Sequence, residues 1–373
     1  MRVLHLLGAA EDTGGILSVI RGLHLAAAGA RGEHVVWVNR AYQETRQPAL
    51  AYRRSRHLLD ESPNHFNLLW RALRSLGELK QLLRCEPFEV LHGHSRGALP
   101  LAVVVSALWR RPVLFTNHAY AHSHLGLYRW AACRRLMHTS VLTPNMARHY
   151  GFSLAAPRFS VISECCADRF FAAPLAGRSG PGKAPLRLVG LGNLVGWKNW
   201  HLLLEALGEL TEAERARLEF HHWGPTPQDA ASLAYAQRLQ EHVRGRHLGK
   251  VVFFHGLSLR VEEPLQQADW FVLPSTNEPC SVALIEALAL GVPALASASG
   301  GNGDIIQAGV TGLLFTPGSA DDLRDQLRFI LAGKAQPASP ERTRESVRHR
   351  SASSVAAQYS RVYERLLAQD QPD

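Results

Sequence analysis

The sequence predicts an α/β protein made of two doubly wound domains, each a parallel sheet with helices on both faces. The prediction rests on an alternation of short β-rich runs with stretches of helical period, which repeats in both halves of the chain. It also rests on length, since 373 residues favour two hydrophobic cores over one. With 46% hydrophobic and 20% charged residues, the composition excludes a disordered or fibrous chain.

Five buried strands are expected in the first half, each a short apolar run rich in β-branched residues. They are Val3–Leu7, Val35–Val38, Val90–His92, Val113–Thr116 and Val141–Thr143. Between them, Phe66–Leu83 repeats leucine at helical spacing and predicts an amphipathic helix. The second half follows the same alternation. Its expected strands are Leu186–Leu191, Leu218–Trp223, Val251–Phe254, Trp270–Leu273 and Val292–Ala296.

The boundary between the domains is expected in a stretch rich in Gly, Pro and Ala. Residues 172–185 read AAPLAGRSGPGKAP and show no apolar periodicity, which is typical of a linker. The first domain is therefore expected over residues 1–171. In doubly wound sheets ligands bind beyond the carboxyl ends of the strands, so function is expected in the loops that follow strands.

Charge is distributed unevenly between the halves. Residues 1–170 hold 21 Arg and Lys against 11 Asp and Glu, whereas residues 171–373 hold 20 against 21. A basic first half suggests an anionic partner, which can be a nucleic acid, a membrane surface or an acidic substrate. No recognition-helix or RNA-binding signature accompanies the charge, so nucleic acid is not expected as the partner.

The apolar runs and the cysteines indicate a cytoplasmic protein without a membrane span. The longest apolar run, Leu99–Trp109, has 11 residues, whereas a transmembrane helix needs about 20. The N-terminal apolar run stops at Gly8 and reads as a first strand rather than as a signal peptide. The five cysteines are scattered without a CxxC pair, so neither a disulfide framework nor a zinc site is expected.

Two loops that follow strands carry candidate binding residues. Gly14 and Gly15 precede a helix, where backbone amides and the helix dipole suit a phosphate, although a plain turn explains them equally well. The stronger signal follows the strand at Phe271–Leu273, where Glu278 and Glu286 stand eight residues apart. Glu286 falls inside an apolar helix, so its carboxylate is expected to have a hydrogen-bonding partner unless it lies on a half-exposed helix face.

This pattern resembles that of the retaining glycosyltransferases of family 4, which have the GT-B fold. The resemblance rests on the two glutamates, the preceding ADWFVLPS and the following EALALGVPALAS and AGVTGLLF. TGG after the first strand, EVLHGHS at 89–95 and FTNHA at 115–119 resemble the N-terminal domain of that family, and YSRVYERLL resembles its closing helix. The resemblance implies two Rossmann-like domains facing a cleft. The closing helix, about 355–373, would join the first domain, and the second would span 172–354.

The resemblance also implies roles in binding a nucleotide-sugar donor. Glu278 would hold the sugar hydroxyls and Glu286 the ribose, because carboxylates accept hydrogen bonds from paired hydroxyls. Lys198 would neutralise the diphosphate, while the second family cation, an Arg, is replaced by Asn193. The remaining donor-side residues expected from the resemblance are Gly14, Gly15, Cys280, Ser281 and Val282.

The histidines are assigned by the same resemblance. His118 corresponds to the active-site histidine of the family, which would donate a hydrogen bond to a sugar hydroxyl or to the acceptor. His94 and Arg96 are further acceptor-side candidates, whereas His122 and His124 are expected in a loop. The spacing of His118 and His122 suits a metal on a helix, but no carboxylate lies near them in the sequence and a strand ends there. No metal site is therefore expected.

The expected activity is transfer of a sugar from a UDP- or GDP-sugar to a hydroxyl acceptor, with retention and without a metal or other cofactor. By family precedent the departing phosphate oxygen takes the acceptor's proton. The acceptor would be a glycan or a lipid-linked glycan of bacterial cell-surface polysaccharide or glycolipid synthesis. Two alternatives remain: a catalytically weak protein that binds nucleotide sugars, suggested by Asn193, and a GT-B-like epimerase of nucleotide sugars.

A peripheral position on the inner face of an anionic membrane is also open. Basic residues of the first half are interleaved with leucine and with Trp70, Tyr128 and Trp130, as in helices that rest on anionic lipid. A solvated helix face explains the pattern equally well. The basic residues are Arg53, Arg54, Arg56, Arg71, Arg74, Lys80, Arg84, Arg129, Arg134 and Arg135.

Overall fold

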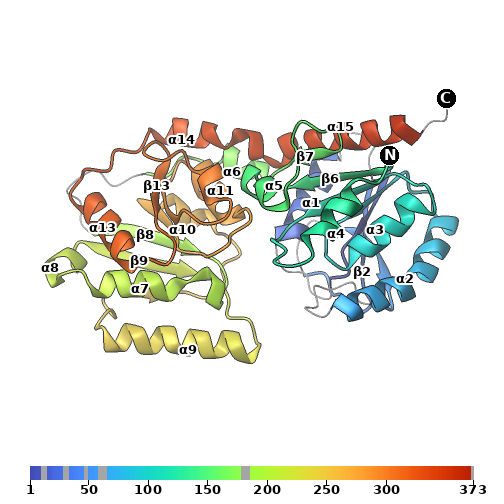
Figure 1. Ribbon diagram of the computed structural model, residues 1–373. Helices are drawn as coiled ribbons and strands as arrows, with labels where there is room; N and C mark the ends of the chain where they lie inside the picture. Colours follow the sequence, from blue (N-terminus) through green and yellow to red (C-terminus); the bar gives the residue numbers. More distant parts are fainter. Residues whose placement is uncertain (10–14, 28–32, 46–48, 58–64, 178–184, 371–373) are drawn as a thin grey trace. The chain divides into compact units, whose positions relative to one another are not determined.

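The computed structural model describes residues 1–9, 15–27, 33–45, 49–57, 65–177 and 185–370. The chain divides into two compact units (Figure 1). One unit contains Met1–Cys165 together with Ala352–Asp373, and the other contains Cys166–Ser351. The first division lies a few residues before the boundary expected at 171, and the helix after 351 belongs to the first unit.

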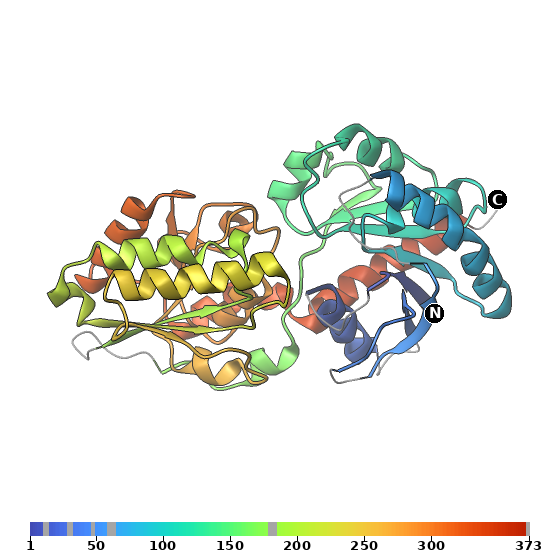
Figure 2. The ribbon, with the colours of Figure 1, turned by 90° about the horizontal axis from the view of Figure 1, so that it is seen from below.

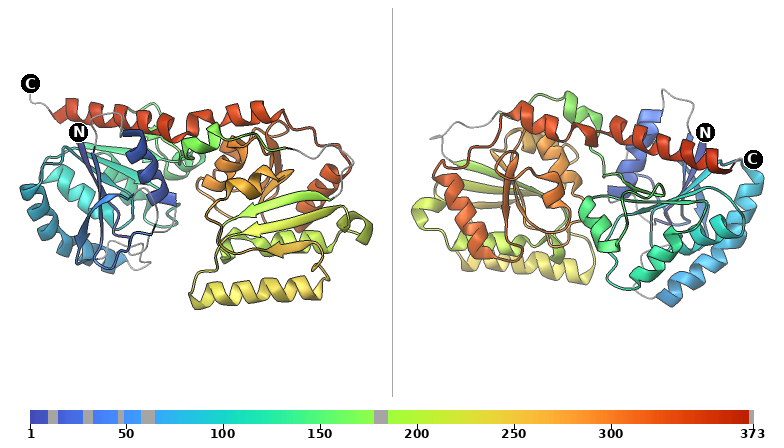
Figure 3. Two further views of the ribbon diagram at one scale, coloured as in Figure 1. Left: turned by 180° about the vertical axis from the view of Figure 1, so that it is seen from behind. Right: turned by 45° about the horizontal axis from the view of Figure 1, so that its top comes forward.

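The first unit is built on seven parallel strands in the order β3-β2-β1-β4-β5-β6-β7. The strands are β1 (Arg2–Leu6), β2 (Glu33–Asn39), β3 (Ala51–Ser55), β4 (Val90–Gly93), β5 (Val113–Asn117), β6 (Met137–Val141) and β7 (Phe159–Val161). Its helices are α1 (Gly15–Ala27), α2 (His65–Cys85), α3 (Ala98–Ala107), α4 (Leu125–Ala132), α5 (Pro144–Tyr150) and α15 (Ala352–Asp370). The last of these lies against α1, far from it in sequence (Figure 3).

The second unit is built on six parallel strands in the order β10-β9-β8-β11-β12-β13. The strands are β8 (Leu186–Leu191), β9 (Leu218–Trp223), β10 (Val252–Phe254), β11 (Trp270–Leu273), β12 (Ala294–Ser297) and β13 (Gly312–Phe315). The helices are α6 (Asp168–Ala172), α7 (Trp200–Gly208), α8 (Glu212–Arg215), α9 (Ala230–Gly245), α10 (Glu262–Gln266), α11 (Val282–Ala289), α12 (Asn302–Ile305), α13 (Ala320–Leu331) and α14 (Pro340–Ser346). Figure 2 shows α7 and α9 side by side over one face of this sheet.

The expected strands agree with the structure in nine of the ten places, three of them to the residue. The exception is Val141–Thr143, which is wrong because β6 ends at Val141 and Thr143 caps α5, accepting a hydrogen bond from the Met146 amide. The expectation missed β3, β7 and β13. β3 has the sequence AYRRS, and its two arginines interrupt the apolar run by which a buried strand is predicted.

Strand order reverses once in each sheet, at β1/β4 in the first unit and at β8/β11 in the second. At such a point the connections run to opposite faces of the sheet, which leaves a crevice beyond the carboxyl ends of the two strands. The loops after these strands, and after their neighbours β5 and β12, are therefore where the fold favours a ligand site.

The C-terminal helix α15 is an integral part of the first unit. Its residues Val355, Tyr359, Val362 and Leu366 are at most 2% exposed, and they share one apolar cluster with residues of β1, β4, β5 and α1. Gly22 of α1 allows this packing, since a Cβ there would lie 3.1 Å from the Ala352 Cβ. The apolar face of a helix that comes last in sequence thus completes the core of the first unit.

Replacing Leu366 by Ala should lower the free energy of unfolding by about 2–5 kcal/mol, because it leaves a cavity against the sheet. The urea midpoint of the chain measures the loss. Glu364→Ala, an exposed change on the same helix, should leave the midpoint nearly unchanged. Equal midpoints for the two variants would contradict the docking of this helix.

Candidate functional site

Three loops of the second unit meet beyond the carboxyl ends of β8, β11 and β12. The Thr276 amide donates to the Trp197 carbonyl at 2.9 Å, which joins the loops after β11 and β8. The Asn277 amide donates to the Ser299 hydroxyl at 2.7 Å, which joins the loops after β11 and β12. The three strands are neighbours in the sheet. The loop that carries Glu278 is therefore held from both sides at the point where the strand order reverses.

Glu278 is fixed by the glycine loop at residues 300–301. The Gly301 amide donates to the Glu278 carbonyl at 2.7 Å. Gly300 has a φ of +58°, and a Cβ there would lie only 2.1 Å from the same carbonyl oxygen. Only glycine tolerates this close approach of two backbones. The segment GGNGDII, expected on the donor side from the sequence, thus lies directly against Glu278.

Lys198 and Glu278 form an ion pair. Lys198 ends a 3-10 turn at Gly196–Lys198, and its Nζ donates to the Glu278 Oε2 at 2.7 Å. The two side chains are 12% and 7% exposed, so the pair is nearly buried. The ammonium also lies 4.4 Å from the centre of the Trp197 ring. The structure therefore brings together the two residues that the sequence assigned to the diphosphate and to the sugar.

Glu286 lies on α11 and is partly buried. The expectation that its carboxylate is hydrogen-bonded is wrong for the part of the chain that the structure describes, since no described residue bonds it. Burial raises the pKa of Glu286 to about 8, which the nearby Arg169 opposes and Glu262 reinforces. A carboxyl group with this pKa is present in both forms near neutral pH, as hydrogen-bond donor and as acceptor.

The start of α11 holds the other predicted donor-side residues. Ser281 is the cap, and its hydroxyl accepts from the Leu284 amide at 3.2 Å, so that oxygen is already engaged. Val282 is the first helical residue, and Cys280 is buried just before the cap. Asn193 is exposed in the loop after β8, where its carbonyl accepts from the Trp200 indole at 3.2 Å.

Arg350 is a residue that sequence reasoning missed. It is 6% exposed, and its guanidinium donates to the Asp304 carbonyl at 3.2 Å and contacts the Cys280 sulfur at 3.9 Å. A buried cation thus joins the Glu278 loop to α12. No signal marked it, because it lies in an arginine-rich stretch far from both contacts in the sequence.

In the first unit, His94, Arg96 and His118 line one small pocket. The other lining residues are Phe115, Asn117, Ala119 and Tyr128. His118 Nδ1 lies 2.7 Å from Glu164 Oε1, and its Nε2 lies 2.9 Å from His94 Nδ1. Both ring nitrogens are therefore engaged within the protein, so His118 can form a hydrogen bond with a sugar hydroxyl only if its bond to His94 is broken.

Other candidate residues of the first half lie at the start of α1 and in the loop before α4. Gly15 is the exposed first residue of α1, and Gly14 lies outside the described residues. His122 and His124 lie in the exposed loop before α4, as expected.

The arginines expected on a basic face are partly engaged elsewhere, because Arg53 pairs with Glu86. Among the described helices, none is both long and apolar enough to cross a membrane.

Two family models match the chain, one on each half. The model of Glycosyl transferases group 1 matches residues 178–350, and that of Glycosyltransferase Family 4 matches residues 13–170. Together they cover most of the sequence.

Two curated relatives are similar to parts of the chain. Sulfoquinovosyl transferase SQD2 of Arabidopsis thaliana is 27% identical over 282 residues, which are 68% of this chain and 51% of the relative. N-acetyl-alpha-D-glucosaminyl L-malate synthase of Bacillus anthracis is 32% identical over 130 residues, 34% of each protein. The chain thus spans about half or less of the length of these relatives.

Solved structures match nearly the whole chain. Sucrose-phosphate synthase from Thermosynechococcus elongatus aligns with a TM-score of 0.80 at 18% identity and covers 99% of each chain. HepE of Anabaena in complex with UDP aligns with a TM-score of 0.75 at 16% identity, over 98% of this chain and 100% of its own. At these identities the likeness shows the fold, and it confirms the GT-B architecture with two Rossmann-like domains. With both halves matched by models of one enzyme class, the chain belongs to the group 1 glycosyltransferases.

Proposed function

We propose that this glycosyltransferase moves a sugar from a nucleoside-diphosphate sugar to a hydroxyl acceptor, with retention of configuration and without a metal. The observation that carries the proposal is the nearly buried Lys198–Glu278 pair, held by three loops where the second sheet reverses its strand order. An ammonium and a carboxylate at one point suit a donor that presents a diphosphate next to sugar hydroxyls. HepE, which shares the fold, has been solved with UDP-glucose.

The charges of the pair would be redistributed when the donor binds. The Lys198 ammonium would turn to the diphosphate, whose negative charge grows as the bond to the sugar breaks. Glu278, released from the ion pair, would accept hydrogen bonds from sugar hydroxyls, which replace the lost partner. The phosphate oxygen that leaves the sugar would take the proton of the acceptor hydroxyl on the same face. Each buried charge thus keeps a partner before and after binding.

Glu286 would bind the ribose. Its carboxyl group has no hydrogen-bond partner within the described part of the unit, so two ribose hydroxyls would satisfy both of its oxygens. Because the anionic form accepts two hydrogen bonds and the protonated form donates one, nucleotide affinity should depend on the protonation of this group.

The first unit would bind the acceptor. We place the acceptor there because His94, Arg96 and His118 share a pocket beyond β4 and β5. We further propose a glycan or lipid-linked acceptor reached from an anionic membrane on the cytoplasmic side. The exposed apolar residues of α2 support this, since Phe66 is 75% exposed and Trp70 is 50% exposed, with Arg74 stacked 4.8 Å from the Trp70 ring centre.

Lys198→Ala should reduce transfer from the true donor by about 10²–10³-fold, the loss seen when one group that stabilises developing charge is removed. A screen of UDP-, GDP- and ADP-sugars that records nucleotide release and glycosylated product measures it. Lys250→Ala, an exposed lysine of the same unit, is the matched control and should keep full activity. Donor binding without transfer to any acceptor would favour a binding protein, and conversion of the sugar without an acceptor would favour an epimerase.

Replacing Glu286 by Gln should stabilise the chain increasingly as pH rises. The pKa of Glu286 is raised to about 8 in the folded state, so its ionisation costs stability progressively from about pH 4.5, its ordinary pKa, to about pH 8. The urea midpoints of Glu286→Gln and the natural chain should therefore diverge between pH 5 and pH 9. Midpoints that stay parallel over this range would show that the carboxyl group is not held in an apolar site.

Removing the apolar surface of α2 should weaken binding to anionic vesicles. The double variant Phe66→Ser/Trp70→Ser should sediment less with phosphatidylglycerol-containing vesicles than the natural chain does, while neither binds neutral vesicles strongly. Leu259→Ser removes an 87% exposed leucine from the second unit and serves as control. Equal sedimentation of all three proteins would leave α2 as a solvated helix.

A further inference from the structure

Four histidines form a row across the first sheet, on neighbouring strands and on one face. His34 lies on β2, His5 on β1, His94 directly after β4 and His118 directly after β5, and these strands are adjacent in that order. His34 is the register partner of Val3, two residues from His5 on β1, so both side chains leave the same face of the sheet. This is the face covered by α1 and α15, because Val3 belongs to the cluster that those helices complete.

Each ring in this row is hydrogen-bonded to the next, always from an Nδ1 to an Nε2. The distances between the two nitrogens are 2.8 Å for His34 and His5, 2.8 Å for His5 and His94, and 2.9 Å for His94 and His118. The row ends on a carboxylate, with His118 Nδ1 2.7 Å from Glu164 Oε1. His5 is fully buried, and Glu164 is 5% exposed.

The carboxylate fixes where every proton of the row sits. A carboxylate only accepts hydrogen bonds, so the neutral form of His118 carries its proton on Nδ1 and presents a bare Nε2. The Nδ1 of His94 must then donate to it, and the same reasoning repeats through His5 to His34. Burial lowers the pKa values of His5 and His94 well below the ordinary value and that of His34 to about 4, so these rings are neutral at physiological pH.

We propose that a proton relay is formed by Glu164, His118, His94, His5 and His34. The relay holds His118 as its Nδ1–H tautomer and links Glu164 to His34 on β2. A proton arriving at His34 Nε2 would let each Nδ1 proton move to the neighbouring Nε2, and the last would pass from His118 Nδ1 to the Glu164 carboxylate. One proton enters at His34 and one arrives at Glu164. Every ring is neutral before and after, with its tautomer reversed.

Glu164 is suited to end such a relay. Its second oxygen, Oε2, is buried and has no hydrogen-bond partner among the described residues. A buried carboxylate oxygen without a partner has lost its hydration without compensation, so Glu164 keeps an acceptor that no described residue satisfies. At the other end, no described residue bonds His34 Nε2, the nitrogen on which a proton would enter.

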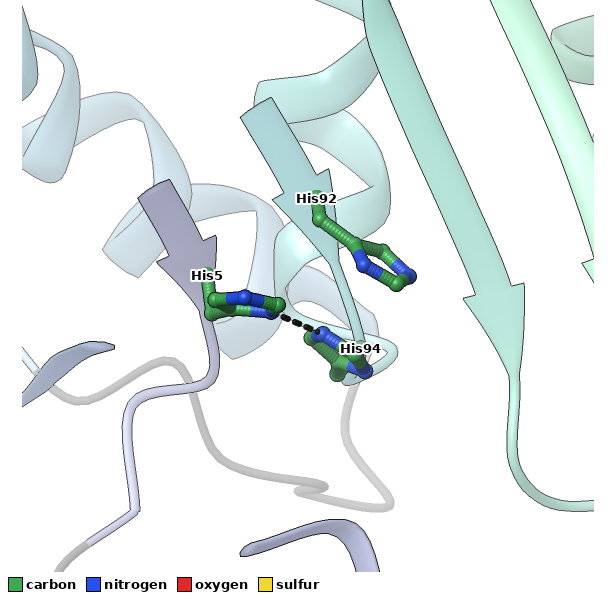
Figure 4. A group of neighbouring side chains, drawn as sticks. All are labelled: His5, His92 and His94. Atoms are coloured by element: carbon green, nitrogen blue, oxygen red, sulfur yellow. Dashed lines mark hydrogen bonds between the residues drawn. The ribbon is translucent and has the colours of Figure 1, made fainter. Parts of the chain in front are cut away.

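A metal centre is the competing interpretation of this cluster. Ring nitrogens of His5, His92 and His94 lie within 4.8 Å of one another, and Figure 4 shows the His5 ring turned toward His94. The nitrogens of His5 and His94 are already bonded within the row. His92 Nδ1 lies 2.8 Å from the Tyr363 hydroxyl and its Nε2 lies 2.8 Å from the Thr116 hydroxyl. A metal would have to displace several of these bonds, so the relay is favoured.

Other titratable groups in the described part of the first unit also face the row. His92 on β4 packs on His94 with ring centres 3.9 Å apart, and Tyr359 and Tyr363 approach it from α15. His24 of α1 and the N-terminal amine further lower the pKa of His34. None of these groups supplies a carboxylate, so among the residues that the structure describes Glu164 sets the direction of the row.

The test is the tautomeric state of each ring, read by NMR of the full chain labelled with ¹⁵N-histidine. At neutral pH all four rings should carry the proton on Nδ1, opposite to the tautomer that free neutral imidazole side chains prefer. Glu164→Gln, whose amide both donates and accepts, should shift the tautomers of all four rings together, including His34, three rings away. A change confined to His118 would overturn the relay.

Two further variants of the chain serve as controls for this measurement. In the background of His94→Phe, which interrupts the row, Glu164→Gln should change His118 alone and leave His5 and His34 unaffected. His138→Gln removes a buried histidine bonded to Ser160 on neighbouring strands, and the four signals should persist in it. One equivalent of tightly bound zinc in the purified chain would overturn the relay in favour of a metal centre, because a metal occupies the lone pairs that the row needs.

The role of the relay in catalysis rests on the proposed function, whereas the NMR measurement contains no substrate. Glu164 and the three outer histidines would be positioning residues, acting through His118. In the transfer assay, Glu164→Gln should therefore alter kcat and its pH profile while the donor KM stays the same. If all four rings carry the proton on Nδ1 and respond together to Glu164→Gln but no transfer occurs, only the proposed function is refuted. If transfer occurs but the four rings do not respond together, only the relay is refuted.

Discussion

Burial of polar side chains at the carboxyl ends of the central strands is the constraint on which both units depend. A charged or polar group that leaves water must find a partner inside the protein. In the second unit Lys198 and Glu278 meet this demand with one ion pair. In the first unit, four imidazoles and Glu164 meet it with a row of hydrogen bonds. The same topology thus supports two kinds of polar site, one held by charge and the other by proton placement.

The backbone around each site follows from this demand. Gly300 and Gly301 bring one loop into contact with the Glu278 carbonyl, so the carboxylate is presented from a backbone that cannot shift freely. In the first unit, Gly93 separates His92 from His94, and a Cβ there would lie 2.9 Å from the Phe115 ring. Small residues at these points let large polar side chains occupy the remaining space.

The sequence was most informative where apolar runs set the strands. Trp270–Leu273 was predicted to the residue, because an uninterrupted apolar run between turns has one plausible structure in a parallel sheet. The loop from Glu278 to Ser281 was also predicted, since Pro279 and Ser281 mark the start of a helix. By contrast, β6 reads MHTSV, and its polar residues moved the expected strand toward Val141–Thr143.

Pairings between residues far apart in the chain could not be predicted from the sequence. Nothing in HLL around His5 or in EHVV around His34 shows that both rings face the same way, because that depends on strand order and register. Glu164 and Arg350 are single polar residues whose partners are far away in the chain, so they look like ordinary surface positions. The ion pair of Lys198 with Glu278 was hidden for the same reason, although each residue was singled out alone.

The charge asymmetry acquires a physical meaning from these pairings. In the near-neutral second unit Lys198 is paired with Glu278, and under the proposed function a bound diphosphate would replace that carboxylate, so no surplus of cations would be needed. In the first unit several arginines are neutralised locally, as Arg2 is by Glu33 and Arg21 by Glu44. Part of the surplus that remains lies beside exposed aromatic side chains, since Arg74 covers the Trp70 ring of α2 at 4.8 Å and Arg134 covers the Trp130 ring at 4.2 Å. Under the proposed function, positive charge beside exposed aromatic residues would suit an anionic surface better than a soluble anion, since a soluble anion leaves the apolar area in water.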